Sequence, residues 1–373
     1  EAFQEGRSAR VAPTHSGRLA PCAFDAVAAH ADSVVSAGMG WNGVSVPLKQ
    51  LGNRRIVTDS VNASGARACR LFAQFGGLEL VQVGGDESGR FQHTPEPTAA
   101  NLSGEGGLCD VVVGSKAAVG FAQDPDADRL AIVDEMGRYI GEEYTLVLAA
   151  WSLMLKRAAF SAELAAEGEV EDEEFEGPPT ICVNLSTSRM IDDLAAEFGA
   201  EVVRTAVGEA NVVEAMKRLT AEGREVVMGG EGNGGVIWPW ICYVRDSLSG
   251  MALVLSLMAQ TGKTVSELVA EIDALASGGK GGGYAIVKRK VDIPSKDAAA
   301  PAVEVVAKAY ADQRIDRQDG VRVDWDDAPH GGGAAWLHVR ASNTEPIMRL
   351  IAEAGSAAQA EAILDAAAGG IGG

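Results

Sequence analysis

The sequence has few cysteines and few histidines, and neither set is grouped. The five cysteines are odd in number, lie far apart and form no Cys-x-x-Cys pair, and the five histidines form no ligand cluster. This distribution argues against a disulfide framework and a zinc site, and it predicts a protein of the reducing cytoplasm. The residues concerned are Cys22, Cys69, Cys109, Cys182, Cys242, His15, His30, His93, His330 and His338.

Long apolar runs and basic residues are also scarce. No uninterrupted apolar stretch approaches the roughly 20 residues that span a bilayer, and no signal peptide is visible. Lys and Arg number 32 against 52 Asp and Glu, so the net charge of −20 disfavours nucleic acid and anionic membranes as partners. We therefore expect a small-molecule partner and a monomer or homodimer.

The most informative segment is residues 120–135, in which three carboxylates occupy alternate positions before the chain turns apolar. Asp124, Asp126 and Asp128 are separated by Pro125 and Ala127, a spacing that lets a tight loop direct all three carboxylates to one point. Like charges this close repel one another, so the group needs a cation. Mg²⁺ prefers oxygen ligands and is the usual choice where phosphate chemistry follows.

Three other interpretations of this loop were weighed. A calcium-binding helix–loop–helix would accommodate Glu135 at its last position, but it requires glycine where the chain has Arg129. A phosphatase with an aspartate nucleophile would need a better apolar strand than residues 120–123 before the first Asp. A solvated acidic turn is the plain structural alternative, since Asp-Pro and Asp-Ala pairs commonly form turns.

A glycine-rich loop at residues 229–235 follows the apolar strand expected at 225–228. Its glycines let a ligand approach the backbone closely. Glu231 and Asn233 suit vicinal hydroxyl groups, because the first accepts hydrogen bonds and the second both donates and accepts them.

A third loop, residues 340–349, follows the strand expected at 335–339. It carries two guanidinium groups, two hydroxyls and exposed backbone amides. Such a set predicts a phosphate site, because arginine presents a fork for paired oxygens.

Taken in order, these loops resemble those of the α-D-phosphohexomutase superfamily, which includes phosphoglucosamine mutase, phosphomannomutase and phosphoglucomutase. The resemblance extends from about residue 24 to residue 365 and includes linking stretches such as 59–65, 91–97, 184–189 and 204–208. The motifs that carry it are DPDADR at 124–129, GEGNG at 230–234 and RASNTEP at 340–346.

The resemblance implies an enzyme in which a phosphoserine exchanges a phosphoryl group with a sugar monophosphate through a hexose 1,6-bisphosphate intermediate. It implies that Asp124, Asp126 and Asp128 hold Mg²⁺, supported by Arg129. The residues expected to contact the sugar are Thr205, Gly208, Glu231 and Asn233. Those expected to hold the non-reacting phosphate are Arg340, Ser342, Asn343, Thr344 and Arg349. We expect Arg129, Arg245, Arg340 and Arg349, together with the metal, to form a local positive cleft on an acidic exterior.

One departure from the family concerns the nucleophile. The Thr-Ala-Ser-His-Asn-Pro loop that carries the phosphoserine is not found in these 373 residues, which contain no Ser-His pair. Ser64 is a tempting substitute, but it aligns with a structural turn. We therefore expect an incomplete chain that is inactive alone, with residues 1–45 as the remnant of a first domain.

The fold class expected is α/β, with tandem mixed-sheet domains of phosphohexomutase type followed by a C-terminal α+β domain. Domains are predicted at 50–158 with the metal loop (residues 124–129), at 178–272 with the sugar loop (residues 229–235) and at 284–373 with the phosphate loop (residues 340–349). A glycine-rich linker at 277–283 and a solvated, mobile acidic insertion at 167–176, within the acidic run 163–176, separate them. The elements expected include strands at 54–58, 78–83, 180–183 and 284–292, and helices at 66–74, 141–157 and 299–311.

The function favoured is that of a phosphoglucosamine mutase, interconverting a hexosamine 6-phosphate and 1-phosphate. Phosphomannomutase or phosphoglucomutase is the alternative within the family, because Glu231 and Asn233 do not distinguish the substituent at sugar C2. Two alternatives come from other classes: a catalytically inactive sugar-phosphate-binding protein and a metal-dependent phosphatase that uses water.

Overall fold

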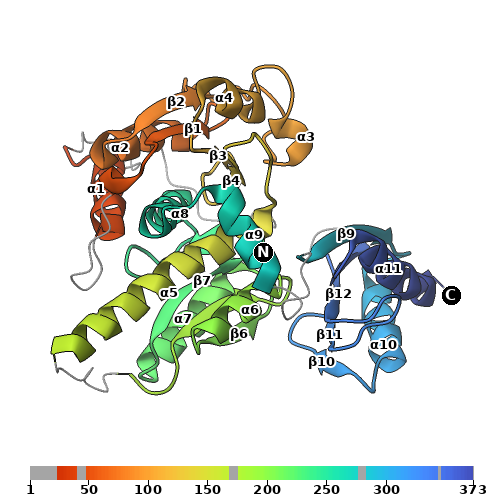
Figure 1. Cartoon of the computed structure of the whole chain (residues 1–373). Helices are drawn as coiled ribbons and strands as arrows, with labels where there is room; N and C mark the ends of the chain where they lie inside the picture. Colours follow the sequence, from red (N-terminus) through yellow and green to blue (C-terminus); the bar gives the residue numbers. More distant parts are fainter. Residues whose placement is uncertain (1–22, 40–47, 168–174, 276–282, 343–345, 373) are drawn as a thin grey trace, which may run out of the picture.

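The computed structural model describes residues 23–39, 48–167, 175–275, 283–342 and 346–372, which form three sheets with their helices (Figure 1). The first two sheets belong to successive α/β units, and the third belongs to a C-terminal α+β unit. The predicted fold class is confirmed. The predicted glycine-rich linker falls almost wholly on residues 276–282, outside the described residues.

The first unit contains a four-stranded sheet in the order β2-β1-β3-β4. Strands β1, β2 and β3 run parallel, and β4 is antiparallel to β3 at the edge. The central strands β1 and β3 are almost wholly buried, as expected of parallel strands covered on both faces. The elements are β1 (Arg55–Asp59), α2 (Gly65–Gly76), β2 (Glu79–Val83), α3 (Ala99–Leu102), α4 (Leu108–Ser115), β3 (Val119–Gln123) and β4 (Leu130–Val133).

The second unit repeats this topology, with strand order β6-β5-β7-β8 and an antiparallel β8 at the edge. The tandem mixed sheets expected from the sequence are therefore present. The elements are β5 (Thr180–Asn184), α6 (Met190–Glu197), β6 (Glu201–Thr205), α7 (Glu209–Ala221), β7 (Val226–Glu231) and β8 (Gly235–Ile237).

Two long helices lie between these sheets and join them into one core. Figure 1 shows α5 (Glu142–Glu167) and α8 (Ser247–Thr261) side by side there, with α9 (Val265–Leu275) following α8. Helix α5 is longer than the predicted 141–157 and includes the first part of the acidic run at 163–176. The predicted acidic insertion at 167–176 begins where this helix ends, and its residues 168–174 lie outside the described part.

Helix α1 (Ala26–Met39) packs against α2 and α8, and a 3₁₀ turn, η2 (Leu48–Gln50), follows the undescribed residues 40–47. Asp25, just before α1, forms an ion pair with Arg67 of α2. The assignment of residues 1–45 to a domain of their own stays a prediction, as do the other domain boundaries.

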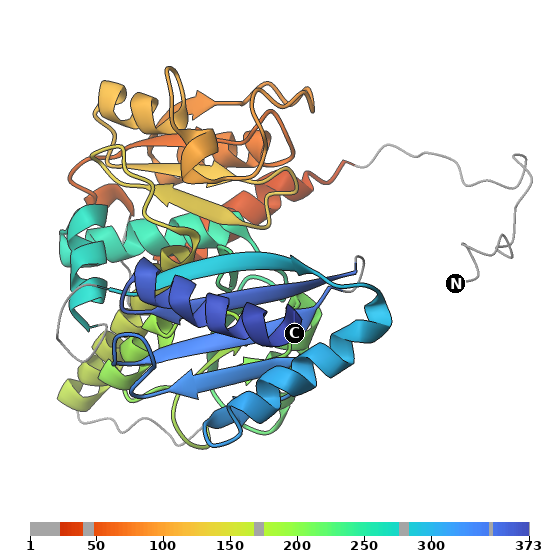
Figure 2. The same cartoon turned by 90° about the vertical axis from the view of Figure 1, so that its right-hand side faces the viewer.

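The C-terminal unit is an antiparallel five-stranded sheet in the order β10-β11-β12-β13-β9. Helices α10 and α11 cover one face of it, and the other face is turned toward the second unit (Figure 2). The elements are β9 (Ala285–Asp292), η4 (Lys296–Ala298), α10 (Ala299–Ala309), β10 (Arg314–Asp316), β11 (Val321–Trp325), β12 (Ala335–Ala341), β13 (Ile347–Ala354) and α11 (Ala357–Gly372).

The interface between this sheet and the second unit is polar. His338 lies 2.8 Å from the Ser186 hydroxyl through Nδ1, and Arg322 donates to the carbonyl of Leu185. Burial lowers the pKa of His338 to about 4, so this histidine is neutral at physiological pH. Hydrogen bonds between buried polar groups therefore contribute to the contact of this face with the second unit.

Helix α8 is buried from Ser247 to Met258, and its first turn depends on Asp246. The Asp246 carboxylate accepts hydrogen bonds from the amides of Leu248 and Ser249, both at 3.1 Å, and lies 3.2 Å from His30 Nε2 of α1.

Among the described residues, no helix is long and apolar enough to cross a membrane.

We expect Asp246→Ala to lower the free energy of unfolding by about 1–2 kcal/mol, because the first-turn amides of α8 lose their acceptor in a buried setting. Asp246→Asn is the matched control, since an amide oxygen still accepts these bonds while the charge facing His30 is lost. Chemical denaturation of the three proteins measures the difference.

The pH dependence of the Asn variant tests the His30 contact separately. The hydrogen bond to Asp246 raises the pKa of His30, against the effect of burial. The pair therefore stabilises the fold below the ordinary histidine pKa, and this contribution is lost as the pH rises through the raised value. The deficit of Asp246→Asn should shrink as the pH rises, and a deficit that grows would contradict the assignment.

Candidate active site

The three predicted metal ligands lie together in the turn between β3 and β4. Asp124 directly follows β3, and the turn is tight enough that Ala127 adopts a left-handed backbone (φ 60°). One carboxylate oxygen from each of Asp124, Asp126 and Asp128 can be chosen so that all lie within 4.8 Å of one another. The sequence spacing therefore does bring the three acids to one point.

Asp124 is held in place by its own loop. Its Oδ1 accepts hydrogen bonds from the amides of Asp128 (3.2 Å) and Arg129 (3.1 Å), and its Oδ2 lies 2.6 Å from Arg129 Nε. Burial tends to raise the pKa of Asp124, but the Arg129 amide and guanidinium outweigh it and lower the pKa. Asp124 is therefore a fixed, ionised carboxylate.

Asp128 is held less completely. Its Oδ2 pairs with Arg245; its Oδ1 is buried and lies 3.7 Å from Arg129 Nε, but it accepts no hydrogen bond from the described residues. Burial raises the pKa of Asp128 to about 6, against the pull of Arg245, and the charges of Asp124 and Asp126 act in the same direction as burial. Three carboxylates with one orphaned buried oxygen fit an oxygen-seeking divalent cation such as Mg²⁺.

Arg245 connects the metal loop, called the acidic loop below (residues 124–129), to the glycine-rich sugar loop (residues 229–235). Its three guanidinium nitrogens contact Asp128, Glu209 (3.0 Å) and Glu231 (2.7 Å). The Leu130 amide also donates to the carbonyl of Gly234 at 3.0 Å. The two loops therefore face the same region, although they come from different sheets.

Glu231 ends β7 and is almost fully buried. Its Oε1 accepts hydrogen bonds from Asn184 Nδ2 (2.7 Å) and from the amide of Gly208 (3.0 Å), while Oε2 takes Arg245. These three hydrogen bonds fix the position of Glu231 in the loop. Its carboxylate oxygens have further lone pairs that can accept a hydrogen bond from a sugar hydroxyl. Asn233 Oδ1, by contrast, is buried and accepts no hydrogen bond from the described residues.

Of the other two residues predicted to contact the sugar, Gly208 contacts Glu231 directly, and Thr205 lies opposite Asn184, which contacts Glu231. Thr205 ends β6, and its hydroxyl donates to the carbonyl of Ala206 at 2.9 Å. Gly208 begins α7 with a backbone (φ 123°) that favours glycine, and it presents its amide to Glu231.

Positive charges lie side by side on the strands that flank the phosphate loop. Arg340 of β12 lies directly opposite Arg349 of β13, and Arg349 lies opposite Lys290 of β9. Like charges on neighbouring strands repel, so this row of three cations favours an anion. Arg340 Nε is buried without a hydrogen-bond partner among the described residues, and Asp319 is 4.0 Å from its Nη1.

The remaining residues of this loop are only partly described. Ser342 is buried, and its amide donates to the carbonyl of Ile347 at 2.9 Å. Asn343 and Thr344 lie outside the described residues. Lys290 was missed by sequence reasoning, because only the strand register distinguishes it from the neighbouring basic residues of β9.

Fewer of the four expected arginines contribute excess positive charge to the cleft than the sequence predicted. Arg129 pairs with Asp124 and Glu96, and Arg245 is shared by three carboxylates, so these two neutralise acids of the site. The row formed by Lys290, Arg340 and Arg349 carries the excess positive charge.

Ser64 has a structural part in this arrangement. Its hydroxyl donates to the carbonyl of Pro125 at 2.7 Å and so braces the acidic loop from the start of α2. Glu135 accepts hydrogen bonds from Ser266, away from the three aspartates, which agrees with the rejection of a calcium-binding loop.

Comparisons with known proteins agree with this architecture. Three profiles described as phosphoglucomutase/phosphomannomutase match the chain: α/β/α domain II at residues 32–137, α/β/α domain III at 159–275 and the C-terminal domain at 286–369. The chain belongs to the phosphoglucomutase/phosphomannomutase family. The resemblance to the α-D-phosphohexomutase superfamily is thereby confirmed.

Among curated relatives, a probable phosphoglucosamine mutase of Methanopyrus kandleri is 33% identical over 315 residues, covering 83% of this chain and 60% of the relative. A phosphoglucomutase/phosphomannomutase of Thermococcus kodakarensis is 31% identical over 324 residues, covering 86% and 61%. The chain thus spans about 60% of the length of these two relatives.

Solved structures share the fold. A putative phosphomannomutase from Thermus thermophilus superposes with a TM-score of 0.64 at 23% identity, covering 94% of this chain and 67% of that one. Aspergillus fumigatus N-acetylphosphoglucosamine mutase, solved in complex with GlcNAc-6P and magnesium, gives a TM-score of 0.55 at 16% identity, covering 91% and 69%.

The join between the two loops requires glycine at position 234. Its φ is +85°, and a Cβ there would lie 2.3 Å from the carbonyl oxygen of Leu130. We expect Gly234→Ala to lower the free energy of unfolding by about 3 kcal/mol, from backbone strain and a clash together. Gly262→Ala is the matched control, since φ is +69° with nothing within 4 Å, and should cost only about 1 kcal/mol.

Thermal and chemical denaturation of the two variants give the comparison. Equal losses of stability would show that the backbone conformation alone matters and that the close contact between the loops does not.

Proposed function

We propose that this chain forms the metal-, sugar- and phosphate-binding part of a phosphohexomutase that interconverts a hexosamine 6-phosphate and 1-phosphate. The observation that carries the proposal is the contact of Arg245 with both Asp128 and Glu231, which turns the acidic loop and the sugar loop toward one site. Asp319 supports a common site for the cationic row and the sugar residues, because its Oδ2 lies 4.0 Å from Arg340 Nη1 and accepts a hydrogen bond from the Val207 amide, next to Gly208, at 3.2 Å.

Different residues are proposed to bind the two ends of a sugar phosphate. Asp124, Asp126 and Asp128 would hold Mg²⁺, which supplies neutralisation of phosphoryl charge when it is bound. Lys290, Arg340 and Arg349 would fix the phosphate at the far end, together with Ser342. Asn233 Oδ1, which has no described partner, would accept from a sugar hydroxyl between them. Charge compensation and positioning of this kind are what phosphoryl transfer requires.

The phosphoryl donor proposed is a phosphoserine, and the intermediate a hexose 1,6-bisphosphate, as in the superfamily. The mutase of Aspergillus fumigatus with bound GlcNAc-6P and magnesium supports a hexosamine phosphate and Mg²⁺ as ligands. Glucosamine phosphate is the substrate we favour, in line with the name of the Methanopyrus kandleri relative. Mannose and glucose phosphates are the alternatives, in line with the Thermococcus kodakarensis relative.

A second candidate function is sugar-phosphate binding without catalysis. It is favoured by one observation, namely that the dipeptide Ser-His of the nucleophile loop does not occur in these 373 residues. We propose a small-molecule partner and a cytoplasmic location for either function, with a monomer or homodimer as the expected state.

The central test is binding and turnover of glucosamine 6-phosphate by the 373-residue chain. We expect Mg²⁺-dependent binding without formation of glucosamine 1-phosphate, even with a bisphosphate primer, because positioning cannot replace a covalent donor. Lys290→Gln should weaken binding about tenfold, as the loss of a charge-assisted hydrogen bond implies, and Lys308→Gln on the opposite face of the C-terminal sheet should not. Calorimetry and product analysis give the two readouts.

Each alternative has its own result. Conversion to the 1-phosphate would refute the need for a phosphoserine loop, and steady release of inorganic phosphate would favour a phosphatase. Absence of binding to any hexose phosphate would refute the proposal as a whole.

The metal assignment is tested by Asp126→Asn. Asp126 is exposed, so this variant should fold normally while binding Mg²⁺ about tenfold more weakly. Asp297→Asn in η4 is the matched control for the loss of one negative charge. Titration with Mg²⁺ measures affinity, and circular dichroism checks the fold; unchanged affinity would argue against a metal at the three aspartates.

A further inference from the structure

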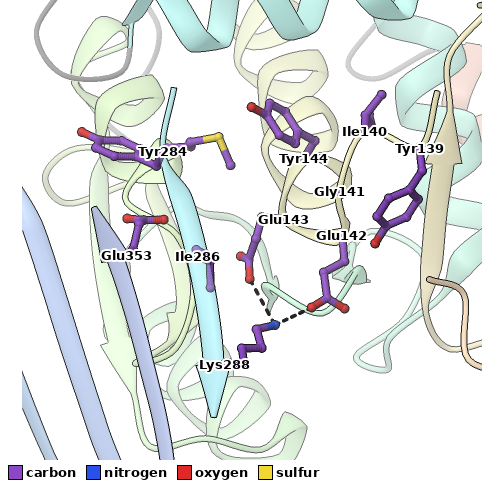
Figure 3. Close-up of a pocket in the computed structure, with 11 residues that line it drawn as sticks. Tyr139, Ile140, Gly141, Glu142, Glu143, Tyr144, Tyr284, Ile286, Lys288 and Glu353 are labelled. Atoms are coloured by element: carbon purple, nitrogen blue, oxygen red, sulfur yellow. Dashed lines mark hydrogen bonds and ion pairs between the residues drawn. The ribbon is translucent and has the colours of Figure 1, made fainter. Parts of the chain in front are cut away.

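A second cavity, of about 430 Å³, lies where the first turn of α5 faces β9 and β13 of the C-terminal sheet (Figure 3). None of its lining residues belongs to the acidic loop, the sugar loop or the cationic row. The residues that matter for its chemistry are Glu142, Glu143, Lys288, Glu353, Tyr144 and Tyr284.

The cavity has more carboxyl groups than cations. Lys288 bridges Glu142 and Glu143, as the dashed lines in Figure 3 show, and its Nζ is 3.7 Å from Glu143 Oε1. Glu353 is on β13, opposite Ile286 rather than Lys288 in the strand register. Three carboxyl groups therefore share one ammonium group among the lining residues.

Two carboxylate oxygens at this cavity lack hydrogen bonds. Glu353 is fully buried; its Oε1 accepts from Trp336 Nε1 (2.8 Å) and the Arg189 amide (2.9 Å), but its Oε2 accepts from none of the described residues. Glu143 Oε1 is likewise buried without a hydrogen bond. Buried carboxylate oxygens of this kind are costly unless a donor reaches them.

The rest of the lining is aromatic and apolar. The hydroxyl of Tyr144 donates to Asp273, and that of Tyr284 donates to Asp193 at 2.9 Å. Both hydroxyls are thus used outside the lining set, and the two tyrosines contribute chiefly their rings to the cavity. Aromatic rings attract cations, and Arg or Lys groups commonly lie over them.

We propose that this cavity binds a small organic cation with a primary ammonium group, whose N–H groups donate to Glu353 Oε2 and Glu143 Oε1 and whose carbon skeleton packs against Tyr144 and Tyr284. An ammonium group has three donors, which is the chemistry that buried carboxylate oxygens lacking hydrogen bonds require. The volume and the aromatic walls favour an organic cation over a bare metal ion, and the excess of carboxyl groups excludes an anion.

Burial favours the protonated, neutral forms of Glu143 and Glu353, because no further cation among the lining residues balances their charge. Burial raises the pKa of Glu143 to about 8, against the pull of Lys288. Burial also raises the pKa of Glu353, while the Ser188 side chain and other neighbours act in the opposite direction. A bound ammonium group would replace a proton at these carboxyls.

The cavity is linked to the sugar loop through Glu143. Its Oε2 accepts a hydrogen bond from the Ser188 amide at 3.2 Å, and a Cβ on Gly232 would lie 1.9 Å from this oxygen. The sugar loop therefore rests directly on a side chain of the proposed ligand site.

Binding of phenethylammonium chloride to the full 373-residue chain tests the proposal, measured by calorimetry with saturating Mg²⁺ present. We expect saturable binding of one equivalent, and at least tenfold weaker binding of 2-phenylethanol, which has the same skeleton without the charge. Neither measurement uses a hexose phosphate or turnover, so the result is independent of the proposed function.

Variants locate the binding. Glu353→Gln keeps an oxygen for Trp336 and Arg189, and it should weaken phenethylammonium binding about tenfold, or about 1.4 kcal/mol. Ile286→Phe narrows the cavity and should also weaken it. Glu361→Gln on α11 and Asp297→Asn in η4 remove the same charge elsewhere and should leave it unchanged.

Several results would overturn the proposal. These are no saturable binding of phenethylammonium, equal affinity for the alcohol, and unchanged affinity in Glu353→Gln with a native circular dichroism spectrum. Binding of K⁺ or Na⁺ at this cavity in place of the amine, detected as stabilisation that Glu353→Gln abolishes, would contradict it as well.

Discussion

The arrangement of the candidate active site depends on one guanidinium group. Arg245 lies among Asp128, Glu209 and Glu231, which come from a hairpin turn of the first sheet, from the start of α7 and from the end of β7. Without a shared cation these buried or half-buried carboxylates would repel one another. Their attraction to Arg245 holds the acidic loop and the sugar loop together across two separate sheets.

The rest of the core is built so that this contact can form. Helices α5 and α8 pack between the sheets and bury apolar side chains against both. They bring the edge strands β4 and β8 close enough for the Leu130 amide to meet the carbonyl of Gly234. Glycine at position 234 allows this approach, because it has no side chain to meet the Leu130 carbonyl and because it readily adopts the positive φ found here.

The C-terminal sheet is joined to this core in a different way. Its apolar face is closed by α10 and α11, and the face that it turns toward the second unit carries His338, Arg322 and Glu353. Polar interfaces of this type between domains are typical of parts that move relative to one another. The row of Lys290, Arg340 and Arg349 also belongs to this sheet, so the candidate phosphate and metal sites lie on units with separate hydrophobic clusters.

The local patterns in the sequence determined much of what is observed. Alternating or continuous apolar runs predicted strands β1, β2, β5 and β9 and helices α2 and α10 to within two residues, because burial of one or both faces dictates such periods. The D-x-D-x-D spacing predicted that three carboxylates converge, since the geometry of a short turn is local. The order of the three loops was enough to identify the family.

Only the tertiary structure decided which charges remain available. Arg129 and Arg245 were expected to make the cleft positive, but they pair with acids that are distant in sequence, such as Glu96 and Glu231. Lys290 joins Arg349 and Arg340 only through the register of β9, β13 and β12, and the carboxyl-lined cavity combines residues more than 200 positions apart. Electrostatic partners and cavities depend on contacts between distant segments, and a sequence pattern records only the neighbours along the chain.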